Sequence, residues 1–208
     1  MSDDPYVYPG TTTLQNKLDI RSAEALDRVE RRFVIQRIRD GVPTGDFDLP
    51  HLQAIHRHLF QDVYEWAGQI RSVEISKDGS KFQLQRYIET GMANAHQRIV
   101  GAGYLKGLSP ADFAAKAGQI IGDVNHVHPF REGNGRTQLQ YLKQLTDQAG
   151  HVLALKKLDR EAWHQASREA NDGRYDAMAR CIEGALIERS RSRSARTIRD
   201  RSRPRDDG

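Results

Sequence analysis

Residues 128–136 read HPFREGNGR and separate two stretches of helical periodicity. Residues 109–125 open with a Ser-Pro helix start and continue with apolar residues every three or four positions, so we expect one helix ending near Asn125. Apolar spacing resumes at Leu139, Leu142 and Leu145. The quoted segment is therefore predicted to be a loop that leads into the start of a second helix.

The composition of this loop suits an anion at a helix start. Pro129 disfavours helical geometry at His128. Gly133 and Gly135 allow positive φ and close approach of a ligand to the backbone, so successive N–H groups can point toward a phosphate. A Gly-Asn-Gly turn on its own is weak evidence, because a simple helix-joining turn can have the same residues.

Three side chains near the turn add the elements of nucleotide chemistry. Arg136, in the first helical turn, can bind phosphate oxygens, and Glu132 can hold magnesium, which takes one or two carboxylates plus substrate phosphates. An unperturbed imidazole titrates near neutrality, so His128 is the natural residue to accept a proton from a hydroxyl. The residues indicate transfer of a group from a nucleotide to a hydroxyl.

A histidine-bound metal is the alternative for this region. The candidate pairs are His126 with His128, near Asp123, and His56 with His58. A catalytic zinc normally needs three protein ligands, and the sequence offers no strong third ligand at the expected spacing.

Helical periodicity dominates the rest of the chain up to about residue 188. Each of the following sets is spaced by three or four and is expected to be the buried stripe of a helix: Leu26, Val29 and Phe33; Leu52, Ile55 and Leu59; Ile88, Met92, Ala95 and Ile99; Tyr175, Met178, Ile182 and Leu186. The fold class is therefore all-α.

Residues 72–84, SVEISKDGSKFQL, break this pattern. Val73 and Ile75 alternate with polar residues before Asp78-Gly79, a favoured pair for a tight reversal, and Phe82 and Leu84 alternate after it. We predict a β-hairpin, which is either a surface ornament or an edge that pairs with an extended partner segment.

Composition and charge limit the setting of the protein. The 208 residues are 38% hydrophobic and lack a membrane-length apolar run. The start MSDDPYVYPG does not resemble an export signal, and the single Cys181 fits a reducing compartment, so we expect a cytoplasmic protein that does not contact a membrane.

The net charge of +4 lies in the tail, residues 189–208, whose eight arginines and three aspartates give +5 and leave residues 1–188 at −1. This Arg/Ser-rich tail is expected to be disordered. It is either a solubilising end or a contact for nucleic acid or an acidic partner.

The loop resembles the signature of the Fic family (filamentation induced by cAMP): His, any, Phe, any, Asp or Glu, Gly, Asn, Gly, Arg, and a second Arg three residues later. It matches through Arg136. DPYVYPG at 4–10, HRHLFQDVYEWAGQIR at 56–71 and KDGSKF at 77–82 are similar to bacterial Fic toxins of the antitoxin-controlled class. Only the tail falls outside the resemblance.

The resemblance implies a Fic-type helical bundle with a β-hairpin flap, forming one domain over residues 1–188 with a core at about 48–150. It also implies adenylylation of a protein Ser, Thr or Tyr hydroxyl using ATP and Mg²⁺. The implied roles are a base for His128, magnesium binding for Glu132, phosphate binding for Gly133, Asn134 and Gly135, β-phosphate binding for Arg136, and support beneath the loop for Phe130. The implied target-docking flap comprises Val73, Ile75, Lys77, Asp78, Gly79, Lys81 and Phe82.

One position departs from the family signature, because Leu139 stands where the second arginine is expected. In the family that arginine contacts the γ-phosphate and the glutamate of an inhibitory helix. Leucine can do neither, and it can instead join Leu142 in the core. We expect weaker γ-phosphate orientation with reduced activity, tolerance of another nucleotide, or less tight inhibition.

The chain lacks a match to the family's inhibitory motif. The nearest stretch, Ala179 to Gly184, has alanine in place of the required Ser or Thr, so we interpret it as part of the last helix. The resemblance then implies a separate antitoxin and, as in this class, a type II topoisomerase subunit as target. The other hypotheses are transfer of a different nucleotide-derived group, and a degenerate scaffold that binds nucleotide or a partner without catalysis.

Overall fold

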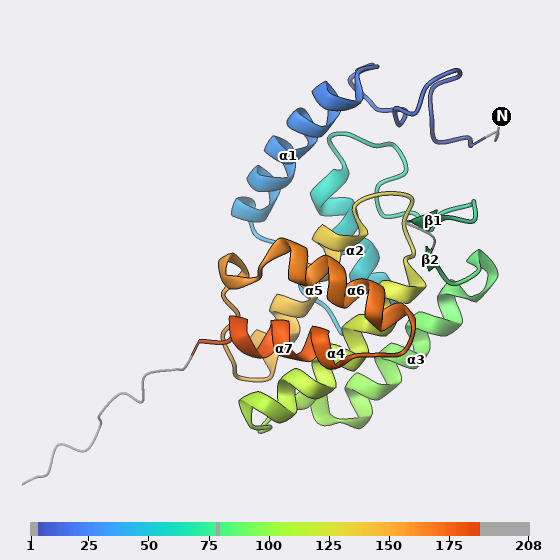
Figure 1. Ribbon diagram of the computed structural model, residues 1–208. Coiled ribbons are helices and arrows are strands. Elements are labelled where there is room, and N and C mark those ends of the chain that lie inside the picture. The colour runs from blue at the N-terminus through green and yellow to red at the C-terminus, as the bar shows by residue number, and fades with distance from the viewer. Residues whose placement is uncertain (1–3, 78–79, 188–208) are drawn as a thin grey trace, which may run out of the picture.

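The computed structural model describes residues 4–77 and 80–187. These form seven α-helices and a two-stranded antiparallel hairpin (Figure 1). The helices are α1 (Ala23–Asp40), α2 (Leu49–Phe60), α3 (Ile88–Gly101), α4 (Pro110–Val127), α5 (Asn134–Gln148), α6 (Arg160–Asn171) and α7 (Asp176–Ala185), and the strands are β1 (Ser76–Lys77) and β2 (Ser80–Lys81). The predicted all-helical fold with a small hairpin is confirmed.

Helix α4 forms the centre of the core and packs against α3, α5, α6 and α7. Its start follows the predicted pattern: the Ser109 side chain accepts from the Asp112 N–H, and Pro110 occupies the first turn. A Cβ at Gly118 would lie 2.9 Å from the backbone nitrogen of Ala179, so a residue without a side chain lets α7 approach closely. The helix ends at Val127, two residues later than predicted.

The buried face of α1 differs from the predicted stripe. Leu26, Glu30 and Val34 are the buried residues, whereas Val29 and Phe33 are only partly covered. Of the six other helices, α2 makes the main contact with α1, so the covered face is narrow and its position is set by α2. The structure therefore buries a carboxylate, Glu30, that periodicity had left on the solvent side.

The hairpin is shorter than predicted. The register pairs Ser76 with Lys81 and Lys77 with Ser80, whereas Val73 and Ile75 precede β1 and Phe82 follows β2. The Val73 carbonyl accepts from the Arg71 guanidinium, so it is not available to a partner strand. Asp78 and Gly79 lie outside the described residues.

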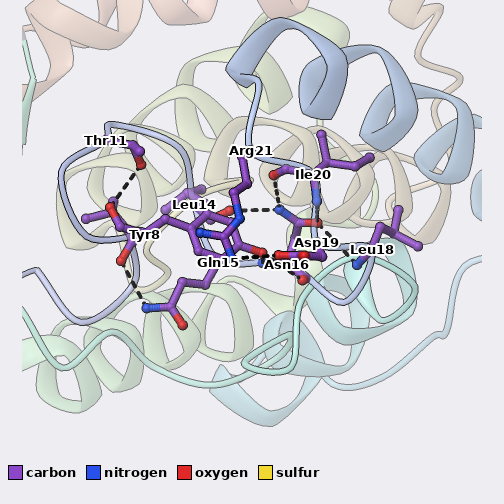
Figure 2. A network of polar contacts seen from close by, with 10 residues as sticks. Tyr8, Thr11, Leu14, Gln15, Asn16, Leu18, Asp19, Ile20 and Arg21 are labelled. Atoms are coloured by element: carbon purple, nitrogen blue, oxygen red, sulfur yellow. Dashed lines mark hydrogen bonds and ion pairs between the residues drawn. The ribbon is translucent and has the colours of Figure 1, made fainter.

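The segment before α1 is fixed by polar contacts with its own backbone (Figure 2). The Asn16 amide donates to the carbonyls of Leu14 and Ile20, at 3.0 and 2.7 Å, and its oxygen accepts from the Ile20 N–H. This ordering brings Asp4 to Arg131 in the loop after α4, with an oxygen–nitrogen distance of 2.7 Å. The amino-terminal segment thus braces the loop that the sequence singled out.

Among the described residues, none of the helices combines the length and apolar character that a bilayer-spanning segment needs. The prediction of a disordered tail at 189–208 lies outside the described part of the chain.

Candidate active site

His128 ends α4 in a left-handed conformation, with φ 47° and ψ 62°. Its N–H bonds the Val124 carbonyl, and its ring Nδ1 lies 3.0 Å from the Asn125 carbonyl oxygen. A carbonyl can only accept, so Nδ1 carries the hydrogen and the lone pair of the neutral ring is on Nε2. This is the tautomer that a general base needs.

The ring of His128 is stacked on Phe82, which follows β2 of the flap. The ring centroids are 3.6 Å apart and the planes differ by 17°. The flap therefore contacts the candidate base directly, which the sequence could not predict from either segment alone.

The Asn134 side chain bonds the backbone of Phe130 and so connects the start of α5 to the first part of the loop. Its side-chain oxygen accepts from the Phe130 N–H at 3.0 Å, and its amide donates to the Phe130 carbonyl at 2.7 Å. The side chain is buried and both of its polar groups are used, so it holds the loop in shape. A contact between Asn134 and phosphate would come from its backbone N–H.

Phe130 and His56 support the loop from below. Phe130 is completely buried and stacks on the His56 ring with centroids 3.9 Å apart. His56 accepts from the Gly68 N–H and lies 2.9 Å from the Glu132 carbonyl, to which its Nε2–H donates. Burial lowers the pKa of His56 to about 3, so the ring stays neutral and keeps these two bonds.

Gly133 must be glycine for two separate reasons. Its φ is +82°, a region that other residues rarely adopt, and a Cβ there would lie 2.4 Å from the Phe60 ring. At Gly135, by contrast, a Cβ would meet nothing within 4 Å. The first-turn N–H groups of α5 have no partners within the helix, so this open side can receive an anion.

Glu132 and Arg136 lie together beside the turn. A Glu132 carboxylate oxygen accepts from the Gly133 N–H at 2.8 Å and lies 3.3 Å from the Arg136 guanidinium. Arg136 also pairs with Glu30 of α1 at 2.5 Å and covers the Phe60 ring, with 4.8 Å from its central carbon to the ring centroid. The Glu132 carboxylate thus lies against two groups that could bind phosphate, the Gly133 N–H and the Arg136 guanidinium.

Arg71 links the flap to the loop. Its side chain is fully buried, and its Nε donates to the His128 carbonyl at 2.9 Å. The rest of the guanidinium donates to the carbonyls of Val73 and Gln83, on the two arms of the flap, and its backbone N–H donates to the Pro129 carbonyl. Neither charge patterning nor periodicity indicated this residue.

A pocket of about 420 Å³ brings the candidate residues together. From the predicted set it is lined by His128, Glu132, Gly133, Asn134 and Gly135, with Ile75 and Phe82 of the flap. Phe130 and Arg136 are outside its lining: Phe130 is buried, and Arg136 contacts the Glu132 carboxylate, which is part of the lining.

A further wall of this pocket, which we call the α6 wall, was missed by sequence reasoning. It consists of α6 residues on one helical face: Trp163, His164, Ser167, Arg168 and Asn171. Asn171 is bonded to Asn125 of α4, with 3.1 Å between its oxygen and the Asn125 nitrogen. Spacing by three and four at these mixed polar and aromatic positions was the available signal.

The alternative of a histidine-bound metal has no support in the described residues, which contain no cluster of three or more metal-binding side chains. The ring Nε2 atoms of His56 and His58 are hydrogen-bonded to two different carbonyls, those of Glu132 and Arg37. Leu139 packs against the hydrophobic core, as expected for leucine at this position.

Comparisons with known proteins agree on one family. The Fic/DOC family model matches residues 46–145. Protein adenylyltransferase VbhT of Bartonella schoenbuchensis is 40% identical over 190 residues, which cover 90% of this chain but only 40% of that protein. Probable protein adenylyltransferase y4lH of Sinorhizobium fredii is 38% identical over 185 residues, which cover 88% of this chain and 91% of that protein.

A solved structure has the same fold over nearly all of its length. BepC from Bartonella tribocorum, crystallised with bound AMPPNP, matches with a TM-score of 0.81 and 27% identity over 89% of this chain and 98% of that one. Since the Sinorhizobium relative is also matched over most of its own length, this chain belongs to the Fic/DOC family, among relatives named protein adenylyltransferases.

Proposed function

We propose that this chain performs the reaction for which its relatives are named, the transfer of AMP from ATP to a hydroxyl side chain of another protein. It acts as a protein adenylyltransferase. The observation that carries the proposal is that His128 and the amide-lined start of α5 face one pocket. A nucleotide phosphate at the helix start would lie next to the group that activates the attacking hydroxyl.

His128 is the general base. With Nδ1–H held by the Asn125 carbonyl, Nε2 takes the proton from a Ser, Thr or Tyr hydroxyl of the target. The oxygen then attacks the α-phosphorus, a new P–O bond forms, and the bond to pyrophosphate breaks. General base catalysis of this kind contributes about 10²- to 10⁴-fold in rate.

The start of α5 and its neighbours bind the phosphates. The backbone N–H groups of Asn134 and Gly135 contact phosphate oxygens, and Arg136 contacts the β-phosphate. Because these donors are fixed before the nucleotide binds, they stabilise the charge that develops on the leaving group.

Magnesium fits this site through Glu132. Glu132 lines the pocket beside the start of α5, and one carboxylate there, together with phosphates and water, meets the preference of Mg²⁺ for one or two carboxylates; Asp4 and Glu74 also line the pocket. The ion would supply charge neutralisation on the phosphates. On this proposal, Glu132 must leave the Gly133 N–H when the nucleotide binds, which frees that N–H for phosphate.

The α6 wall accommodates the nucleoside. Trp163 offers an aromatic surface to a base, while Ser167 and Asn171 offer hydrogen-bonding groups to a base edge or ribose. ATP is the nucleotide we propose, because a related structure contains AMPPNP.

The flap docks the target. Ile75 and Phe82 line the pocket next to His128, so an extended target segment pairing with the flap would place its hydroxyl near the base. The other flap positions proposed for docking are Val73, Lys77, Asp78, Gly79 and Lys81, within a single domain of residues 1–188.

The biological role follows from the resemblance to antitoxin-controlled Fic toxins. We infer a cytoplasmic toxin that modifies a type II topoisomerase subunit and is inhibited by a small antitoxin. The Ala179–Gly184 stretch lies in α7, with Ile182 buried in the core, which suits a structural role and leaves inhibition to a separate protein.

Leu139 favours a second candidate, transfer of another nucleotide-derived group. Without a second arginine, the γ-phosphate loses a charge-assisted hydrogen bond worth about 1.5 to 3 kcal/mol. A nucleotide with a different distal group would therefore be less disfavoured here than in relatives that keep this arginine.

The test is labelling of a bacterial lysate with ATP that carries the label on the α-phosphate, beside the His128→Ala variant. We expect a labelled protein with wild type and none with the variant, and no label from γ-labelled ATP. Label only from another nucleotide would establish the second candidate. Intact nucleotide binding with no transfer from any nucleotide would leave a binding scaffold.

The Leu139→Arg variant tests the account of the missing arginine. We expect ATP to bind about 10-fold more tightly while ADP binding is unchanged, because the added guanidinium reaches only the γ-phosphate. Equal affinities for ATP in the variant and wild type would refute that account.

A further inference from the structure

Glu30 is a buried carboxylate with no part in the proposed reaction. It lies in the middle of α1 and is 4% exposed, on a helix whose other charged residues are at the surface or half-buried. Burial of a carboxylate is unfavourable unless partners compensate it. A glutamate kept in this position must therefore be strongly engaged.

Two partners engage the two oxygens of Glu30. The Tyr64 hydroxyl donates to Oε2, and the Arg136 guanidinium pairs with Oε1 at 2.5 Å. Tyr64 is 2% exposed, and its burial together with the adjacent Glu30 charge raises its pKa, so it remains a hydrogen-bond donor. Glu30 thus joins α1, the segment after α2 and the first turn of α5.

The same contacts restrain Arg136 on several sides. Phe60 covers one face of the guanidinium, and the nitrogen not used by Glu30 lies 3.3 Å from Glu132, which lines the pocket. A free arginine side chain has about 2 kcal/mol of rotamer entropy to lose on binding. A guanidinium that is already fixed loses less of it when a phosphate arrives.

We propose that Glu30, supported by Tyr64, is a positioning residue that holds Arg136 ready for the β-phosphate of the nucleotide. The inference rests on the proposed function, since it assigns that phosphate to Arg136. Glu30 is buried and its negative charge is paired with the guanidinium. We therefore expect the lost orientation of Arg136 to outweigh the relief of repulsion between Glu30 and the phosphate when Glu30 is replaced.

The test compares the affinities of ADP and AMP, measured by calorimetry in magnesium buffer. Glu30→Met keeps the volume but accepts no hydrogen bond, and we expect it to weaken ADP binding about 10-fold and AMP binding less than about 2-fold. Glu30→Gln keeps one acceptor and should fall between Met and wild type. A merely structural role would lower thermal stability without changing the ratio of ADP to AMP affinity.

Two further variants keep the test decisive. Tyr64→Phe leaves the Glu30–Arg136 pair in place and should change the same ratio in the same direction by a smaller factor, even if the Glu30 variants fold poorly. Glu24→Gln removes the same charge from the exposed first turn of α1 and should leave the ratio unchanged.

Three outcomes are separable. Equal losses for ADP and AMP, or tighter ADP binding in Glu30→Met, would overturn the role of Glu30 while leaving transfer by His128 intact. Failure of wild type to bind either nucleotide would overturn the proposed function itself, and this inference with it.

Discussion

The loop at 128–136 and the flap at 72–84 face the same pocket but are held very differently. The loop is fixed by buried side chains from several elements. Asn134 is hydrogen-bonded to Phe130, His56 is hydrogen-bonded to the Glu132 carbonyl, and the Phe60 ring packs against Gly133. The flap has two strands of two residues each, and its own residues are mostly exposed or half-buried. The groups proposed to react are thus held in place, while the surface proposed to dock the target can adapt.

This difference separates the expected effects of mutations. Changes that reach the loop should lower the free energy of unfolding, because buried groups lose partners. Changes confined to the flap should leave stability nearly unchanged and alter only the transfer reaction. Arg71, which belongs to both regions, is the strongest test of the distinction.

We expect Arg71→Leu to have the largest effect. It leaves the carbonyls of His128, Val73 and Gln83 without their buried donor, and each unsatisfied group costs about 1 to 3 kcal/mol. Urea unfolding should show a loss of about 3 to 5 kcal/mol. Arg86→Leu, a change of the same kind at an exposed position near the flap, is the control, and an equal loss in both variants would contradict the role of Arg71.

The two glycines of the loop form a second, matched test. Gly133→Ala places a Cβ against Phe60 at a positive φ, and we expect about 2 to 3 kcal/mol of destabilisation. Gly135→Ala lies in a helix with open space around it and should stabilise by about 0.5 to 1 kcal/mol while weakening nucleotide binding. If both variants lost the same stability, the loop would not be held as we describe.

The sequence indicated the loop and its candidate residues, which are marked by local patterns. It did not indicate the side chains from distant segments that hold or surround the loop. The order of helix, loop and helix was readable because Pro129, Gly133 and the apolar stripes are local signals. Glu30, Arg71 and the α6 wall were missed because their roles depend on contacts between segments distant in sequence. Glu30 is 106 positions from Arg136, and nothing in the α1 pattern distinguishes it from a solvated glutamate.

The free energy of unfolding should fall at mildly acidic pH because of His56. This loss begins at pH values where the His56 ring of the folded protein is still neutral. Its pKa is about 3 when folded, against about 6.5 when unfolded, so between these values the unfolded state binds more protons. Stability is then lost as the pH falls from 7 toward 3, by about 2 kcal/mol at pH 5 from this residue. His51, whose burial also lowers its pKa, adds a loss of the same sign.

Urea unfolding at pH 7 and pH 5 measures this dependence. His56→Phe keeps a ring against Phe130 but cannot titrate, so it should reduce the difference in unfolding free energy between the two pH values by about 2 kcal/mol. An unchanged difference in this variant would mean that His56 is not the group responsible.

The smallest effect is expected where the flap touches the loop. Phe82→Ala removes the ring stacked on His128, a contact worth about 0.5 to 1.5 kcal/mol, and should slow transfer about 3- to 10-fold. Stability should change little, because the side chain is only half-buried and lies on the flap. Leu84→Ala, at an exposed position of the same segment, should leave the rate unaltered. A loss of stability in Phe82→Ala as large as that in Gly133→Ala would show that flap and loop form one rigid unit, and docking would then have to be as exact as the chemistry.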